Sequence, residues 1–197
     1  MINVLNRADL RELAVVGRGL EILDWTLYDS LVIATGGTQT SFKYFQQAVG
    51  PSGVTLQTTN MEIPGQLPAG YKFVPQRIVF TPKQALTLTA ADVKDIVAVS
   101  HRGSAQLFIG NRPYLQVDLQ DLIGGCLIGF AGAFDAATSL AYAAPRARLD
   151  GTLEYSPVIP ANFSFSMVVT YDAAPTLVKN TTLVAKLVGK MIRPQQG

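Results

Sequence analysis

The chain has 197 residues and a formal net charge of +2, and a length of this order is enough for one domain with its own core. Charged residues make up only 15% of the sequence, so we expect much of the surface to be buried against a partner or against copies of the chain. Cys126 is the single cysteine, which excludes an internal disulfide and a four-cysteine zinc site.

The N-terminal segment is predicted to be an amphipathic helix from Arg7 to about Leu23. Apolar residues recur there at spacings of three and four, at Leu10, Leu13, Val16, Leu20 and Leu23. Gly17 and Gly19 are unfavourable in a helix and allow a break near Gly17. The cations off the apolar row indicate either a solvated face or contact with a partner or packaged nucleic acid; they are Arg7, Arg11 and Arg18.

Beyond this segment the composition changes to residues that favour strands. We predict strands at 25–35, 40–49, 54–60 and 71–81, separated by glycine and proline turns. The alternation in the last of these slips around Pro75, which predicts an edge strand or a β-bulge.

The middle of the chain has weaker patterns. Residues 90–95 read as a short helical turn, although 93–100 reads equally as a strand. Short strands are predicted at 104–110 and 114–119, because Gly110-Asn-Arg-Pro113 is a strong turn signal. A further short apolar segment covers 126–130, and the alanine-rich stretch 131–148 is either a small-residue helix or a surface loop.

The clearest strand signal lies near the C-terminus. Large apolar side chains alternate with Ser164, Ser166, Val168 and Thr170 over nine residues, and they form one row: Phe163, Phe165, Met167, Val169 and Tyr171. This predicts a core strand. The segment 181–192 admits a helix or a strand with equal weight, and residues 193–197 form a tail.

These elements predict an all-β fold, an antiparallel jelly-roll β-sandwich with a short N-terminal helix. The expected organisation is a helical arm at residues 1–24, a β domain at 25–178, and a C-terminal strand or helix with its tail at 179–197. The helix and the tail are candidate assembly arms, with interface residues at Arg7, Leu10, Arg11, Leu13, Arg18 and Arg193.

Residues with catalytic or metal-binding chemistry are sparse. His101 is the only histidine, so a two-histidine metal site cannot form, and no nucleophile motif accompanies it for a triad with Asp92 or Asp95. No linear calcium motif occurs, although calcium held by loops or between subunits stays open. We therefore expect no enzyme activity and no cofactor. No apolar run reaches 18 residues, so we expect no membrane span, and the early charges at the N-terminus predict no secretory signal.

Three phrases resemble segments of jelly-roll capsid proteins from tailless icosahedral bacteriophages. They run from Thr59 through Gly65-Gln-Leu-Pro-Ala-Gly-Tyr71, from Ile109 to Tyr114, and from Ile159 to Pro175. The resemblance implies a capsid subunit of the virion that packs with copies of itself and with other virion proteins. Because no secretory signal is predicted, we expect assembly in the host cytoplasm, and the basic residues would make weak contact with packaged nucleic acid. The alternative is a carbohydrate- or ligand-binding β-sandwich, for which Tyr71, Tyr114 and Tyr142 would form the binding platform.

Overall fold

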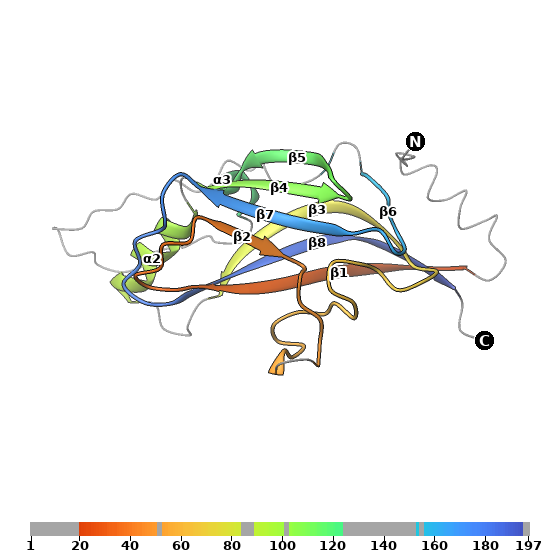
Figure 1. Ribbon diagram of the computed structural model, residues 1–197, viewed down its shortest axis with the longest axis horizontal. Coiled ribbons are helices and arrows are strands. Elements are labelled where there is room, and N and C mark those ends of the chain that lie inside the picture. Colours follow the sequence, from red (N-terminus) through yellow and green to blue (C-terminus); the bar gives the residue numbers. More distant parts are fainter. Residues whose placement is uncertain are drawn as a thin grey trace.

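The computed structural model describes residues 20–50, 53–83, 89–100, 103–123, 153 and 156–194. Eight strands and two short helices lie in these ranges (Figure 1). Their bounds are β1 Leu20–Ile33, β2 Ser41–Tyr44, β3 Lys72–Lys83, α2 Ala90–Ser100, β4 Gly103–Ile109, β5 Arg112–Asp118, α3 Leu119–Leu122, β6 Ile159–Pro160, β7 Phe165–Tyr171 and β8 Thr181–Pro194.

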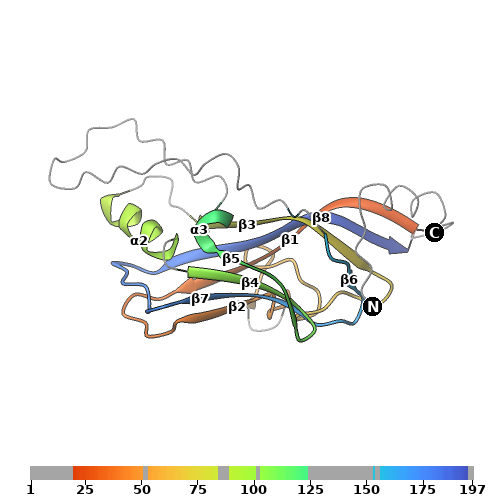
Figure 2. The ribbon, with the colours of Figure 1, turned by 90° about the horizontal axis from the view of Figure 1, so that it is seen from above.

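The strands form two four-stranded antiparallel sheets, which lie as separate layers in Figure 2. The first sheet has the order β1-β8-β3-β6, and the second has the order β2-β7-β4-β5. All pairings between named strands are antiparallel. The prediction of an all-β sandwich is therefore confirmed.

The core lies between the two sheets and is built from alternating side chains. In β7, Phe165, Met167, Val169 and Tyr171 are all at most 3% exposed, as their period-two pattern predicted. The rings of Tyr44 on β2 and Phe80 on β3 pack edge to face across the sheets, 5.6 Å apart. Phe163, the first residue of the predicted row, was placed wrongly: it precedes β7 and is 52% exposed, because Asn162 adopts a positive φ and turns the chain.

The helix predicted to reach Leu23 is wrong at its C-terminal end, since Leu20–Leu23 belong to β1. These residues pair with Met191–Pro194 of β8, and this ladder overrides the helical spacing of their side chains. The rest of the predicted helix, with Arg7, Leu10, Arg11, Leu13 and Arg18, lies outside the described residues. Because β1 begins at Leu20, it runs across the boundary expected between residues 24 and 25.

The C-terminal segment is a strand, one of the two alternatives left open by the sequence. β8 pairs with β1 on one side and with β3 on the other, so it is the middle one of the three long strands of the first sheet. It continues to Pro194, which places Arg193 in the ladder and not in a tail.

The strand predicted at 54–60 is wrong. The Thr55 carbonyl accepts the N–H groups of Thr58 and Thr59, and its hydroxyl accepts the Gln57 N–H, so the segment turns locally. Its one β-bridge to the sheet among the described residues joins Asp29 and Thr59. The strand predicted at 40–49 is shorter than expected, because Phe45 has a φ of 66° and ends β2 at Tyr44.

Two ambiguous signals resolve into a bulge and a helix. The register of β3 against β8 shifts between Pro75 and Arg77, and the Gln76 carbonyl in the bulge accepts the Leu153 N–H. Residues 90–100 form α2, whose start is fixed by reciprocal hydrogen bonds between Thr89 and Asp92.

The turn predicted between β4 and β5 is present, with Gly110 at a φ of 61°. The segments 126–130 and 131–148 lie outside the described residues.

Candidate functional site

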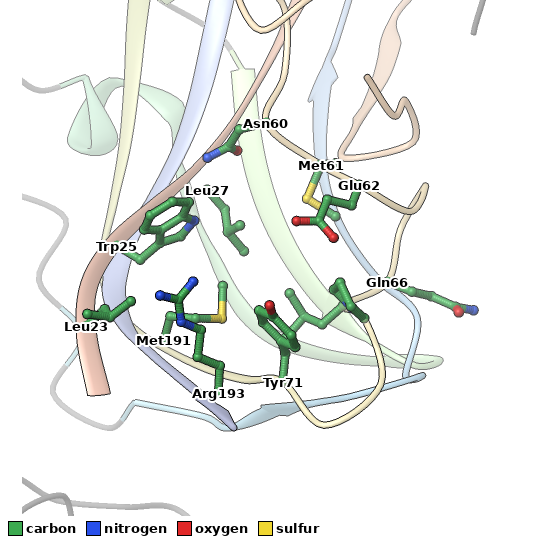
Figure 3. Close-up of a pocket in the computed structure, with 12 residues that line it drawn as sticks. Leu23, Trp25, Leu27, Asn60, Met61, Glu62, Gln66, Tyr71, Met191 and Arg193 are labelled. Atoms are coloured by element: carbon green, nitrogen blue, oxygen red, sulfur yellow. The ribbon is translucent and has the colours of Figure 1, made fainter. Parts of the chain in front are cut away.

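The candidate site is a pocket at the end of the sandwich where β1 and β3 begin and β8 ends (Figure 3). Its volume is about 90 Å³. The apolar wall consists of Leu23, Trp25, Leu27, Met61, Leu67, Pro68 and Met191. The polar side chains that line it are Asn60, Glu62, Gln66, Tyr71 and Arg193. The site thus combines a small apolar depression with groups of both charges.

The register of the first sheet explains why these side chains meet. Leu23 lies opposite Met191, which in turn lies opposite Phe73, so the three project from the same face of the sheet. Two residues further along each strand, on the same face, Glu21 lies opposite Arg193. Arg193 Nε donates a hydrogen bond to Glu21 Oε2 over 2.9 Å. This ion pair is the largest cause that raises the pKa of Arg193.

A glycine in β8 allows the strands to approach closely beside the pocket. Trp25 lies opposite Gly189, and Gly189 lies opposite Pro75, next to the bulge. A Cβ atom on Gly189 would lie 2.0 Å from the backbone oxygen of Val74, a distance that no side chain can adopt. The Trp25 side chain is 43% exposed and stands over this depression.

The loop after residue 58 holds the other side of the pocket against the free edge of β1. Asn60 acts as a partner strand would: its Oδ1 accepts the Tyr28 N–H over 2.9 Å, and its Nδ2 donates to the Thr26 carbonyl over 2.7 Å. Thr59 Oγ1 adds a hydrogen bond to the Tyr28 carbonyl. Further along, Gly65 has a φ of 66° and donates its N–H to the Phe45 carbonyl. The pocket rim is therefore held by hydrogen bonds from the Asn60 and Thr59 side chains and from the Gly65 N–H group to neighbouring backbone.

A buried carboxylate supports the same loop from within. Asp29 is fully buried, and its two oxygens accept the N–H groups of Ser30 over 3.1 Å and of Phe45 over 2.5 Å. Burial raises the pKa of Asp29 from 3.8 to about 6, although the hydrogen bonds from Phe45, Ser30 and Thr59 act in the opposite direction. Asp29 thus links β1, the end of β2 and the loop.

The structure brings one predicted interface residue, Arg193, into this pocket. Of the predicted binding platform, Tyr71 lines the pocket, whereas Tyr114 lies on β5 of the other sheet and does not. Tyr142, His101 and Cys126 are outside the described residues. The sequence did not identify four other residues of the pocket, because the composition around them indicated only a strand or a loop and no binding site. They are Trp25, Asn60, Met61 and Glu62.

The two aspartates considered for a catalytic triad have structural contacts. Asp92 bonds to Thr89 and pairs with Lys179, and these contacts lower the pKa of Asp92 to about 2. Asp95 is buried and accepts the N–H groups of Val178 and Lys179. Both therefore tie α2 to the chain that leads into β8.

The part of the chain that the structure describes holds no group of three or more histidine, cysteine or acidic side chains arranged to bind a metal. Neither of the two described helices has the length and hydrophobicity needed to cross a bilayer. Comparison of the chain with family models, with characterised proteins and with solved structures found no match.

Proposed function

We propose that this protein is a structural subunit of an icosahedral virus particle, a capsid protein that assembles with copies of itself and with other virion proteins. The observation that carries the proposal is the strand order. An eight-stranded sandwich with the orders β1-β8-β3-β6 and β2-β7-β4-β5 is the arrangement expected if the chain folds as a jelly roll, in which consecutive strands repeatedly change sheet.

The three phrases that resemble phage capsid proteins support the proposal because they meet in space. The Gly110 N–H donates to the Ser164 carbonyl, which links the second phrase to the third. The Phe165 N–H donates to the Gly65 carbonyl, and the Asn162 N–H donates to the Leu67 carbonyl, which links the third phrase to the first. The first two phrases and the beginning of the third therefore lie together, and the third then continues along β7 towards α2.

The size of the pocket favours a protein partner over a small ligand. Pockets for drug-sized ligands and cofactors are usually about 300–1,000 Å³, whereas this pocket has about 90 Å³. That volume suits a single apolar side chain of a neighbouring subunit. The charged pair of Glu21 and Arg193, together with Glu62, would then lie at the rim of a mainly apolar contact, which is the usual anatomy of an interface.

Assembly is tested by light scattering and negative-stain electron microscopy of the purified protein over a range of concentration and ionic strength. We expect pentamers, hexamers or closed shells. A homogeneous monomer under all of these conditions would overturn the proposal.

The second candidate function is a carbohydrate-binding module, and one observation favours it. Trp25 and Tyr71 both face the pocket, and aromatic rings beside polar groups suit the faces and hydroxyls of a sugar (Figure 3). Glycan-array binding that is lost in a Trp25→Ala variant, by a protein that stays monomeric, would select this function over the first.

A further inference from the structure

The first half of β1 is an open edge of the first sheet, along the lower side of the sandwich in Figure 1. The N–H and carbonyl groups of Tyr28 both bond to Asn60, on the side of β1 that faces away from β8. Backbone groups of alternate strand residues point the same way, so those of Ile22 and Asp24 face the same edge. Within the described ranges, no hydrogen bond to these groups is found.

The other strands at the edges of the two described sheets are protected against pairing. β6 has two residues, β2 has four, and β5 contains Pro113 and a bulge in its ladder. Short strands, prolines and bulges are the usual means by which a sheet edge avoids a second chain. β1 has 14 residues, no proline and an unshifted register with β8. Asn60 covers its edge only from Thr26 onward, so the half before Thr26 is suited to pairing.

The charges of this half select one register for pairing with a second copy. In an antiparallel pair of identical strands, the residue on the two-fold axis lies opposite itself. An axis at Glu21 or Asp24 would place two carboxylates opposite each other, which is destabilising. An axis at Leu23 would place Leu20 opposite Thr26, whose carbonyl already accepts a hydrogen bond from Asn60. An axis at Ile22 avoids both conflicts.

The same register continues an apolar row across the axis. Ile22 lies opposite Ile192 within the sheet, so two copies would align four isoleucines side by side. Ile22 is half-buried in the single chain, and Leu20, at the start of the strand, is 40% exposed. The pairing would therefore cover apolar surface as well as satisfy backbone groups.

The charged side chains at this edge are compensated within each copy. Asp24 pairs with Lys190 of the neighbouring strand, and Glu21 pairs with Arg193. In the register centred on Ile22, Asp24 of one copy lies opposite Leu20 of the other. No uncompensated carboxylate thus meets another across the axis, so the edge is electrostatically complementary to itself.

We propose that two copies of this chain join through the β1 edge from Leu20 to Asp24, antiparallel about a two-fold axis at Ile22. The two four-stranded sheets then form one continuous sheet of eight strands. Each hydrogen-bonded pair, Ile22 with Ile22 and Leu20 with Asp24, exchanges two backbone hydrogen bonds. The inference deepens the proposed function and rests on it in taking a second copy as the partner. A contact this short is weak alone, which suits a shell in which many such contacts act together.

The first test is disulfide cross-linking in a Cys126→Ser background, where the introduced cysteine is the only thiol. Opposed residues of an antiparallel pair have Cα atoms about 4.5–5.5 Å apart, a distance that a disulfide can bridge. Ile22→Cys lies on the axis, and we expect mild oxidation to give a covalent dimer on a non-reducing gel. Asp24→Cys is more exposed but would lie about 13 Å from its counterpart, so we expect no dimer. The double variant L20C/D24C should restore the cross-link.

The second test needs no cysteine. Ile22→Lys places two ammonium groups opposite each other on the axis, and we expect sedimentation velocity to show a dimer at least tenfold weaker than the wild-type dimer. Val32→Lys is the matched control, because Val32 is exposed on the same face at the other end of β1. We expect it to leave dimerisation unchanged. Circular dichroism and urea unfolding establish that the variants fold.

Three results would overturn the proposal: no covalent dimer from Ile22→Cys or L20C/D24C, cross-linking of Asp24→Cys as strong as that of Ile22→Cys, or equal weakening by Val32→Lys. These results are separable from the assembly test. Particles that form from the wild-type protein while Ile22→Cys gives no dimer would refute this inference alone. A covalent Ile22→Cys dimer of a protein that forms no larger particle would refute the capsid proposal alone.

Discussion

Asp29 makes the folded protein less stable as the pH rises through the weakly acidic range. Its carboxyl group has a pKa of about 6 in the folded state and 3.8 without burial. Between these values the folded chain binds more protons than the unfolded chain, so the free energy of unfolding falls as pH increases. A difference of about two pKa units corresponds to about 3 kcal/mol, an upper bound for the change between pH 4 and pH 7.

The assay is urea unfolding at pH 4.5, 5.5, 6.5 and 7.5, with Asp29→Asn as the matched variant. Asparagine has the same shape and no charge, so we expect the contribution of this site to the slope to disappear, even if the variant is less stable at every pH. The difference between the two slopes also removes the contribution of titratable groups that both proteins share. Equal slopes in the two proteins, or a wild-type stability that rises relative to the variant, would show that the buried carboxylate does not act as described.

Three further predictions concern the pocket, the strand beside it and the start of α2. Arg193→Glu places a carboxylate beside Glu21 and Glu62, and we expect the variant to lose assembly in light scattering. Its free energy of unfolding in urea should fall by less than about 1 kcal/mol, because a partly exposed ion pair contributes little to stability. Lys43→Glu, the control on the other sheet, should assemble normally. Gly189→Ala should destabilise the fold by more than about 3 kcal/mol or prevent soluble expression, whereas the exposed Gly36→Ala should cost only the strain of its positive φ. Thr89→Ala removes the N-cap of α2 and should cost about 1 kcal/mol in urea unfolding, a loss that Thr89→Ser should largely avoid.

Sequence periodicity predicted the parts of the fold in which burial and local pattern agree. β7 is such a case, since its apolar row faces the core. The bulge near Pro75 was also visible, because proline cannot continue a regular ladder and the alternation changed phase there. At 20–23, by contrast, the same leucines fit both a helical stripe and a strand, and only the distant partner β8 decides between them.

The candidate site was largely invisible in the sequence because its residues come together through tertiary contacts. Asn60 substitutes for a neighbouring strand, a role that depends on β1 lying beside it and not on any local motif. Arg193 was predicted as an interface residue in the C-terminal tail, and its place at the pocket follows from its pairing with Glu21, 172 positions earlier in the chain.

Gly189 shows how one residue without a side chain can determine both the fold and the site. The absence of a Cβ atom lets the Val74 carbonyl approach β8, and the adjacent bulge then shifts the register of the following residues. Without that shift, Arg77 and the residues after it would exchange faces, because a slip of one residue inverts the pleat. Ile78 and Phe80 would then leave the core. The close approach at Gly189 is therefore a condition both for the core and for the pocket beneath Trp25.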